Sequence, residues 1–322
     1  MSVSKNTSSW QPTSSLDIIK KRAALYQKIR SFFAEKNVLE VETPLLCQHT
    51  VTDPHIESFA VPVQSNQSYY LQTSPEYAMK RLLAAGSGAI YQITKSFRIG
   101  ESGRKHNPEF TMLEWYRPDF THHDLMHEID LFLQATIETK PADKISYKQL
   151  FLNHLKINPL AATTAALKKC IADHNIAIDI ASLNHDTCLE VLLSHLIEPT
   201  LGCEKPLFLY DFPPSQAALS RIRQDDEPVA ERFELYLHGT EIANGFHELT
   251  DATEQKNRFE KNQMTRMTHN QSVPAIDYFF IDALQSGLPP CSGVAIGLDR
   301  LLMHYIQSNT IQDVITFPFD RA

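Results

Sequence analysis

The 322-residue sequence has no apolar run approaching the roughly 18 residues of a membrane-spanning helix. Its first fifteen residues, MSVSKNTSSWQPTSS, are polar and lack the apolar segment of a secretion signal. The five cysteines are scattered and form no C-x-x-C pair, which argues against a disulfide framework or a thiolate zinc site. Together these absences predict a protein of the cytoplasm.

An excess of basic residues is also missing. Lys and Arg number 30 against 38 Asp and Glu, so the formal net charge is −8. Domains that bind nucleic acid usually carry a basic patch, so this charge balance does not favour stable tRNA binding. The sequence contains no G-x-x-x-x-G-K-[ST] loop, and its one G-x-G pair, Gly86 and Gly88, lacks the third glycine of a dinucleotide fingerprint. A nucleotide site in this chain would therefore have to be built on an antiparallel sheet.

The order of the expected elements indicates an α+β fold with an antiparallel sheet. Residues 1–15 are rich in Ser, Thr and Asn and are expected to form a flexible tail, ahead of one folded domain over 16–322. Strands that are joined by hairpins and interrupted by helices are typical of this class. Residues 119–205 or thereabouts have a helical pattern with Asn, Asp and Pro breaks, which predicts a helical insertion packed beside the sheet.

Capping residues and periodicity place the individual elements. One helix is expected over 16–36, behind Ser14 or Ser15, and another from Ser74-Pro75 to about Gly86. A capping box over 251–254 opens a third helix. Strands are expected over 38–46, 89–98, 109–117, 206–210, 231–237, 240–249 and 292–297, the last of which runs into a helix.

The hairpin of residues 89–117 carries the most specific pattern. Alternation along its second arm places Phe110, Met112, Glu114 and Tyr116 on one face and the odd-numbered residues 109–115 on the other. An aromatic ring, a carboxylate and a phenol at successive same-face positions predict a ligand groove. A structural cross-strand ion pair is the alternative interpretation.

Acidic residues gather in the segment ERFELYLHGTEIANGFHEL, which holds Glu234, Glu241, Asn244 and Glu248. Buried carboxylates are costly unless they meet cations or a metal. Because Glu234, Glu241 and Asn244 are spaced by 7 and 3 residues, their side chains cannot all lie on one face of a regular strand. We therefore expect a bulge or bend near Asn244-Gly245 that redirects these side chains. The alternative is a set of carboxylates that face solvent.

One further pair of possible metal ligands, His123 and His127, lies four residues apart on an expected helix. No third ligand is close in sequence, so an exposed helix face is favoured over a zinc site.

Taken in order, these segments resemble the catalytic domain of class II aminoacyl-tRNA synthetases of the lysyl type. The resemblance rests on the first helix with the strand that ends at Pro44, on SFRIGESGRKHNPEFTMLEWY (96–116), on EIANGFHEL (241–249) and on SGVAIGLDRLLM (292–303). It implies a six- to seven-stranded antiparallel sheet flanked by helices, which binds ATP through arginines instead of a glycine loop. Because the first motif begins near residue 16, we expect no anticodon-binding OB domain.

The short and acidic form resembles a bacterial branch of this family. That branch activates a lysine-type amino acid, (R)-β-lysine in preference to α-lysine, and transfers it to a lysine side chain of elongation factor P. The resemblance implies ATP and Mg²⁺ as cofactors, an aminoacyl adenylate as intermediate, and a homodimer built on the first motif. It implies no stable tRNA binding and no membrane.

The resemblance also implies roles for individual residues. Arg98 would hold the α-phosphate and the amino-acid carboxylate, and Arg300 would clamp the γ-phosphate; both are expected to be catalytic. Other ATP contacts are expected from Ile99, Gly100, His106, Asn107, Phe110, Glu241, Ile242 and Gly297. Mg²⁺ is expected on Glu234 and Glu241. The amino acid is expected to meet Ser74, Pro75, Glu76, Glu114, Tyr116, Asn244, Glu248 and Ala295.

Two positions depart from the family pattern. The usual Arg-x-Glu of the second motif reads Arg98-Ile99-Gly100, with Glu101 one place late. Ala295 stands where lysyl-tRNA synthetases have glycine, which suits a repositioned substrate amine. Basic residues near the site, namely Lys80, Arg81, Arg104 and Lys105, are expected to dock an acidic protein partner.

Three alternatives remain compatible with the sequence. The first is a truncated enzyme that charges tRNA, and the second is a catalytically silent regulatory paralogue. The third is an ammonia-dependent asparagine synthetase, whose aspartate substrate would need a cationic pocket where this sequence gathers acids.

Overall fold

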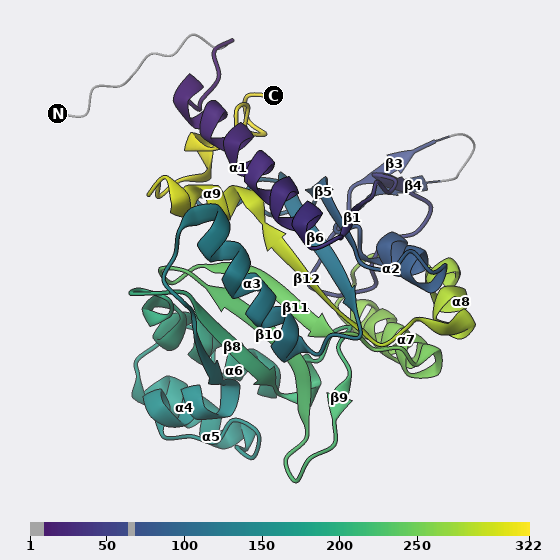
Figure 1. The fold of residues 1–322 in the computed structure, drawn as a ribbon. Helices are drawn as coiled ribbons and strands as arrows, with labels where there is room; N and C mark the ends of the chain where they lie inside the picture. The colour runs from purple at the N-terminus through teal and green to yellow at the C-terminus, as the bar shows by residue number, and fades with distance from the viewer. Residues whose placement is uncertain (1–9, 64–67) are drawn as a thin grey trace, which may run out of the picture.

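The computed structural model describes residues 10–63 and 68–322, and its centre is a nine-stranded sheet (Figure 1). Six neighbouring strands of this sheet pair antiparallel throughout. In spatial order they are β5 (Ile90–Phe97), β6 (Glu109–Pro118), β12 (Cys291–Gly297), β11 (Glu241–His247), β10 (Val229–Tyr236) and β8 (Leu207–Phe212). The α+β prediction with an antiparallel sheet is therefore confirmed.

Short strands extend this sheet at both edges. β1 (Leu39–Glu40) pairs parallel with β5, β7 (Asp143–Ser146) pairs parallel with β8, and β9 (Ile222–Arg223) pairs with β10. A separate three-stranded sheet consists of β2 (Leu46–Cys47), β4 (Ser68–Leu71) and β3 (Ala60–Pro62). The single strand expected over 38–46 is wrong, because the chain makes one short pairing on each side of Pro44, a residue that donates no ladder hydrogen bond.

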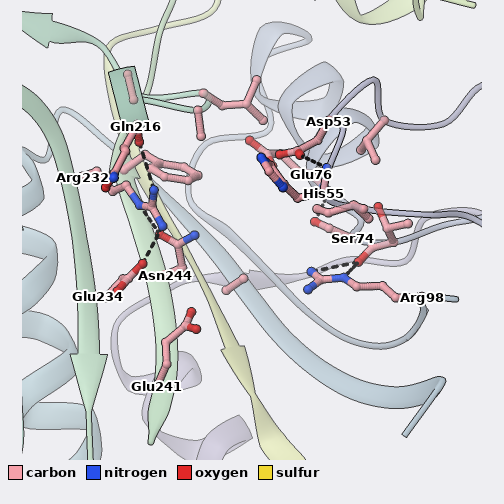
Figure 2. A pocket seen from close by; sticks show the side chains of 18 of the residues that line it. Asp53, His55, Ser74, Glu76, Arg98, Gln216, Arg232, Glu234, Glu241 and Asn244 are labelled. Atoms are coloured by element: carbon pink, nitrogen blue, oxygen red, sulfur yellow. Dashed lines mark hydrogen bonds and ion pairs between the residues drawn. The ribbon is translucent and has the colours of Figure 1, made fainter. Parts of the chain in front are cut away.

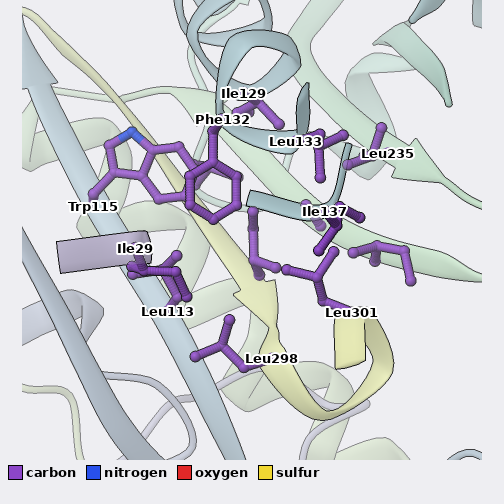
Figure 3. Close-up of a cluster of buried hydrophobic side chains, with 14 of the residues drawn as sticks. Ile29, Leu113, Trp115, Ile129, Phe132, Leu133, Ile137, Leu235, Leu298 and Leu301 are labelled. Carbon is purple, nitrogen blue, oxygen red and sulfur yellow. The ribbon is translucent and has the colours of Figure 1, made fainter. Parts of the chain in front are cut away.

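Three helices cover one face of the central sheet: α1 (Leu16–Glu35), α3 (His122–Ile137) and α9 (Leu298–Tyr305). Their apolar residues meet the odd-numbered residues of β6, of which Leu113 and Trp115 are fully buried (Figure 3). The ring of Trp115 lies 5.7 Å from that of Phe132, and its Nε1 donates to Glu128 at 3.1 Å. This face of the sheet therefore forms the main core, and the other face bears the even-numbered side chains of β6.

The start of α1 is fixed by a helix cap and by hydrogen bonds to the C-terminal segment. Ser15 caps the helix by accepting from the Ile18 amide. Thr13 donates its amide and hydroxyl to the carbonyls of Thr316 and Ile315, and Ser14 is buried. Residues 1–9 of the expected tail lie outside the described residues, but 13–15 belong to the packed unit, which corrects the expected boundary.

The segment 119–205 is only in part the insertion that was expected. Helices α4 (Tyr147–Leu155), α5 (Thr164–Asp173) and α6 (His185–Leu192) form a second core with β8 and β10. However, α3 lies over the main sheet, and β7 adds a strand that the helical pattern concealed. The segment ends in a π-helical turn at Leu193–Ile197 and a 3₁₀ turn at Glu198–Thr200. Two further 3₁₀ turns lie outside it, at Pro214–Gln216 and Ile311–Asp313.

Helices α2 (Glu76–Ala84), α7 (Ala252–Thr268) and α8 (Tyr278–Gly287) form a third cluster around Met79, Phe259 and Phe280. Figure 1 shows them together beyond one end of β6 and β12. The sequence pattern predicted α2 and α7 but not α8. Within the described residues, no helix combines the length and apolarity that crossing a bilayer requires.

A buried arginine joins α7 to the loop of residues 52–57. Arg266 is 1% exposed and donates to the carbonyls of Thr52, Asp53, Ile56 and Ser272, and it pairs with Glu57 at 2.9 Å. Five acceptors on one guanidinium leave none of its nitrogens unused, so Arg266 anchors this loop to α7.

We expect Arg266→Met to lower the free energy of unfolding by about 3 kcal/mol, because it leaves several buried carbonyls without a donor. Urea denaturation monitored by circular dichroism measures the change. The matched control is Arg30→Met, which removes a half-exposed pair with Glu40 and is expected to cost less than about 1 kcal/mol. Equal losses in the two variants would contradict the role of Arg266.

Candidate active site

A cavity of about 880 Å³ opens on the sheet face opposite the main core. The same alternation that buries Leu113 and Trp115 turns Phe110, Met112, Glu114 and Tyr116 of β6 into this cavity, as predicted. Of the residues that the sequence pointed to, the cavity is lined by Ser74, Glu76, Arg98, His106, Asn107, Phe110, Glu114, Tyr116, Glu234, Glu241, Ile242, Asn244, Glu248, Ala295, Gly297 and Arg300. Pro75, Ile99 and Gly100 do not line it.

One end of the cavity is acidic. Glu76, Glu114 and Glu248 come from α2, β6 and the end of β11, and all three line the wall. Glu114 accepts from the Tyr116 hydroxyl at 2.6 Å and from the Ser74 hydroxyl at 2.8 Å. These two donors fix the carboxylate in place, so the acidic end is preformed.

Burial governs the ionisation of these acids. It raises the pKa of Glu114 to about 7, with Glu76 adding to the change and the Tyr116 and Ser74 hydroxyls opposing it. Burial also raises the pKa of Glu248 to about 8, although the ammonium of Lys80 opposes the change. Carboxyl groups held in this way gain from any cation that enters the cavity.

A glycine makes room for the acidic end. A Cβ at Gly293 would lie 2.2 Å from the ring of Tyr116 and 2.7 Å from a carboxylate oxygen of Glu248. Gly293 faces Tyr116 across the β12–β6 pair. Only a residue without a side chain permits both groups to occupy their observed positions.

Two arginines that the sequence pointed to also line the cavity. Arg98 donates to the Thr73 carbonyl at 3.4 Å, pairs with Glu101 at 3.3 Å and lies over the Phe110 ring (Figure 2). Arg300, in the first turn of α9, donates to the Glu241 carbonyl at 3.0 Å and contacts His106 Nε2 at 2.5 Å. Burial lowers the pKa of His106, and the positive charge of Arg300 lowers it further, which favours the neutral imidazole.

The loop of the second motif, which precedes β6, is hydrogen-bonded to two other parts of the chain. Asn107 donates to the Glu109 carbonyl and accepts from the Phe319 amide, so its carboxamide is engaged on both sides. Lys105 donates to Thr240 at 2.6 Å. The loop therefore connects the C-terminal segment to the turn between β10 and β11.

The acids of β10 and β11 line another part of the cavity wall. Glu234 accepts from Arg232 and from the Tyr236 hydroxyl, and Arg232 also donates to Asn244 at 3.2 Å (Figure 2). The expected bulge near Asn244-Gly245 is wrong in position: the register shifts where Tyr236 pairs with Glu241, which leaves Ile242 without a partner. The extra residue turns both Glu241 and Asn244 toward the cavity, so the redirection itself takes place as predicted.

Glu241 is the acid best suited to a metal ion. Burial raises its pKa to about 7, and the nearby Glu234 carboxylate raises it as well, while Arg300 opposes them. A divalent cation would offset the repulsion between the Glu241 and Glu234 carboxylates, and oxygen ligands are the kind that Mg²⁺ takes. The residues present therefore fit a magnesium ion.

Comparison with known proteins identifies the family. The model for class II tRNA synthetases of the D, K and N type matches residues 3–321. The chain belongs to this family. Proteins named elongation factor P–(R)-β-lysine ligase from Salmonella gallinarum, Salmonella typhi and Salmonella paratyphi B are each 49% identical to it, over 98% of this chain and 99% of theirs. This synthetase-family chain thus matches relatives of its own length.

Lys80 corrects one expectation. It does not belong to a basic docking surface: it is 1% exposed, and its ammonium lies 2.6 Å from Glu76 and 2.5 Å from Glu248. The cavity also contains residues that the sequence reasoning missed. Arg232 is the chief one, and its position two residues before Glu234 on the same strand face was the available signal. The others at the cavity wall include Asp53, His55 and Gln216 (Figure 2).

A group of possible metal ligands lies on the opposite sheet face. In the described part of the chain it is the one such group, and it consists of His122, Glu231 and His247, without His123 or His127. Arg221 contacts Glu231 at 2.5 Å. Burial by itself would raise the pKa of Glu231, but His247 and Arg221 reverse this and lower it to about 2. Because Arg221 already pairs with the Glu231 carboxylate, the group is a buried polar cluster built on that ion pair.

We expect Gly293→Ala to lower the free energy of unfolding by about 2 kcal/mol, because the new methyl group collides with the Tyr116 ring. Urea denaturation measures the loss. Gly103→Ala is the matched control, since a Cβ there meets open space. If both alanines proved neutral, the close packing around Gly293 would be refuted.

Proposed function

We propose that this protein is an ATP-dependent ligase that attaches a lysine-type amino acid to elongation factor P. It activates (R)-β-lysine, in preference to α-lysine, as an aminoacyl adenylate and transfers it to a lysine side chain of that factor. The relatives named for this reaction match nearly the full chain. The observation that carries the proposal is one continuous cavity whose wall holds a cluster of three carboxylates together with Arg98 and Arg300.

In the first step a carboxylate oxygen of the amino acid attacks the α-phosphorus of ATP, and pyrophosphate leaves. The attacking group is ionised at neutral pH, so positioning and charge neutralisation provide the catalysis. Arg98 is the proposed partner of the α-phosphate and of the amino-acid carboxylate, and its planar donor fork suits the charge that develops there. Arg300 is the proposed clamp on the γ-phosphate.

Adenine is proposed to stack on Phe110, beside His106 and Asn107. Ile242 and Gly297 offer backbone along the nucleotide, and a Cβ at Gly297 would have only ordinary contacts, with Arg300. Glu234 and Glu241 would hold Mg²⁺, which supplies charge neutralisation to the phosphate oxygens. Arg232 already pairs with Glu234, which leaves Glu241 as the stronger ligand.

The acidic end is the proposed site of the two substrate ammonium groups. Glu248 and Tyr116 would receive the distal ammonium, with Glu114 beside them, and Glu76 would receive the other. Asn244 would hold the carboxylate. Ala295 pairs with Glu114 across the sheet, so its methyl group lies where it can shift the substrate amine.

In the second step the acceptor amine attacks the carbonyl of the adenylate. An amide bond forms, AMP leaves, and the amine loses a proton. A translation factor as acceptor places this reaction in the cytoplasm.

We expect Glu248→Gln to retain ATP binding but to lose amino-acid activation by 100-fold or more. Removing one partner of a desolvated charge pair costs about 3–5 kcal/mol. ATP–pyrophosphate exchange measures activation, and calorimetry measures ATP binding. Glu260→Gln, on the surface of α7, is the control and should behave as wild type. Wild-type exchange in Glu248→Gln would rule out the assignment of Glu248.

The acceptor is tested by offering elongation factor P and total tRNA side by side with ATP, Mg²⁺ and labelled (R)-β-lysine. We expect intact-mass spectrometry to show one added lysyl mass on the factor, and tRNA to remain uncharged, because a net charge of −8 opposes a polyanion. Transfer should fall as the pH drops below the acceptor pKa, normally about 10.4, since only the neutral amine attacks. Charged tRNA with unmodified factor would overturn the proposal.

We further propose that the protein is a homodimer. Apolar side chains are exposed around the first motif, namely Leu39, Leu45 and Leu46, next to Pro44. We expect light scattering to give twice the chain mass of 36.6 kDa, and Leu46→Glu to weaken association. A fully active monomer would contradict this proposal.

A further inference from the structure

A lysine lies directly behind the acidic end of the cavity. Lys80 projects from α2 and is 1% exposed, and it does not line the cavity. Its ammonium lies 2.6 Å from Glu76, 2.5 Å from Glu248 and 5.7 Å from the centre of the Phe280 ring. This buried ammonium therefore forms ion pairs with two carboxylates that line the cavity.

The contacts hold the two acids in fixed positions. Glu76 and Lys80 are one helical turn apart on α2, whereas Glu248 follows β11, so the ammonium links a helix to the sheet. Other ionisable groups around the pair are Glu114 and Tyr116 of β6 and Cys291 of β12. Burial by itself would lower the pKa of Lys80, but Glu248 and Glu76 reverse this and raise it above its ordinary value. Lys80 therefore stays charged.

Counting charges then gives Lys80 a role in specificity. When ionised, Glu76, Glu114 and Glu248 with Lys80 present a net charge of −2 at this end of the cavity. A lysine-type amino acid brings two ammonium groups, which balance it. A neutral side chain such as that of norleucine would leave one negative charge buried without a partner, and that is unfavourable.

We propose that Lys80 is a positioning and specificity-determining residue, which holds the Glu76 and Glu248 carboxylates in place and adjusts the charge of the cavity to a substrate with two ammonium groups. This inference rests on the proposed function. It adds a residue that touches neither the substrate nor ATP and acts through the two carboxylates.

The sign of the pH effect follows from the pair. Lys80 lowers the pKa of Glu248, so its removal raises that pKa and reduces the ionised fraction at neutral pH. Binding of the distal ammonium should weaken at neutral pH and recover as the pH rises. A pKa that rises by about one makes the ionised form roughly tenfold scarcer relative to the protonated form at a fixed pH.

The test is ATP–pyrophosphate exchange between pH 6.5 and 9 with (R)-β-lysine, α-lysine and norleucine. For Lys80→Met we expect the KM of both lysines at pH 7 to rise about tenfold or more, and the profile of kcat/KM to move toward alkaline pH by about 1. The preference for lysine over norleucine should fall by a similar factor. ATP affinity should stay unchanged, which shows that the variant is folded.

Two further variants make the result decisive. Lys169→Met is the matched control, because Lys169 forms the same kind of one-turn pair with Asp173 on an exposed helix face. Lys80→Arg keeps the charge but displaces it, so it should raise the KM of lysine more than that of norleucine without moving the pH profile. If Lys80→Met does not fold, Lys80→Arg still decides the question, since an equal rise in the KM of lysine and of norleucine refutes the inference.

Failure of the inference differs from failure of the proposed function. Wild-type protein that exchanges with neither lysine fails the proposed function, and calorimetric binding of lysine to wild type and Lys80→Arg then tests Lys80. Active wild type whose pH profile and substrate preference are both unaffected by Lys80→Met overturns the inference alone.

Discussion

The central constraint in this molecule is that each inner strand of one sheet serves two opposite environments. On β6, Leu113 and Trp115 point into an apolar core while Glu114 and Tyr116 point into a charged cavity. The apolar face contributes stability by burial, and carboxylates on the other face are costly to bury. A one-residue slip in register would exchange the two faces, so the core fixes the register and thereby aims every residue of the site.

Charged groups of both signs line the cavity. The three carboxylates of the acidic end form one cluster, two arginines come from other segments, and two further acids come from β10 and β11. Each charge is held by a neighbour: Glu114 by two hydroxyls, Glu234 by Arg232, Glu76 and Glu248 by Lys80. Glu241 differs from these acids in that the nearby Glu234 carboxylate adds to the effect of burial in raising its pKa.

Rigid connections outside the sheet bring distant segments to the same cavity. Arg266 fixes the loop of residues 52–57 from α7, and Asn107 fastens the second-motif loop to Phe319 near the C-terminus. Preorganised groups of this kind do not have to reorganise when charge develops in a reaction. The site is therefore assembled from all parts of the chain, although the sheet carries most of its side chains.

The sequence by itself determined the class of fold and the two faces of β6, because strand alternation and capping are local properties. The family motifs pointed to further residues of the cavity wall, but not to Arg232, Asp53, His55 or Gln216. Tertiary structure alone decided the parallel pairing of β1, the strand β7, the place of the bulge at Ile242 and the position of α3 over the main core. It also decided the ion-pair partners of Lys80. In sequence Lys80 is a helical residue beside Arg81, indistinguishable from a solvated cation, and only the return of β11 toward α2 brings Glu248 to its ammonium. Pairings between segments that are far apart in the chain depend on packing, which no local pattern records.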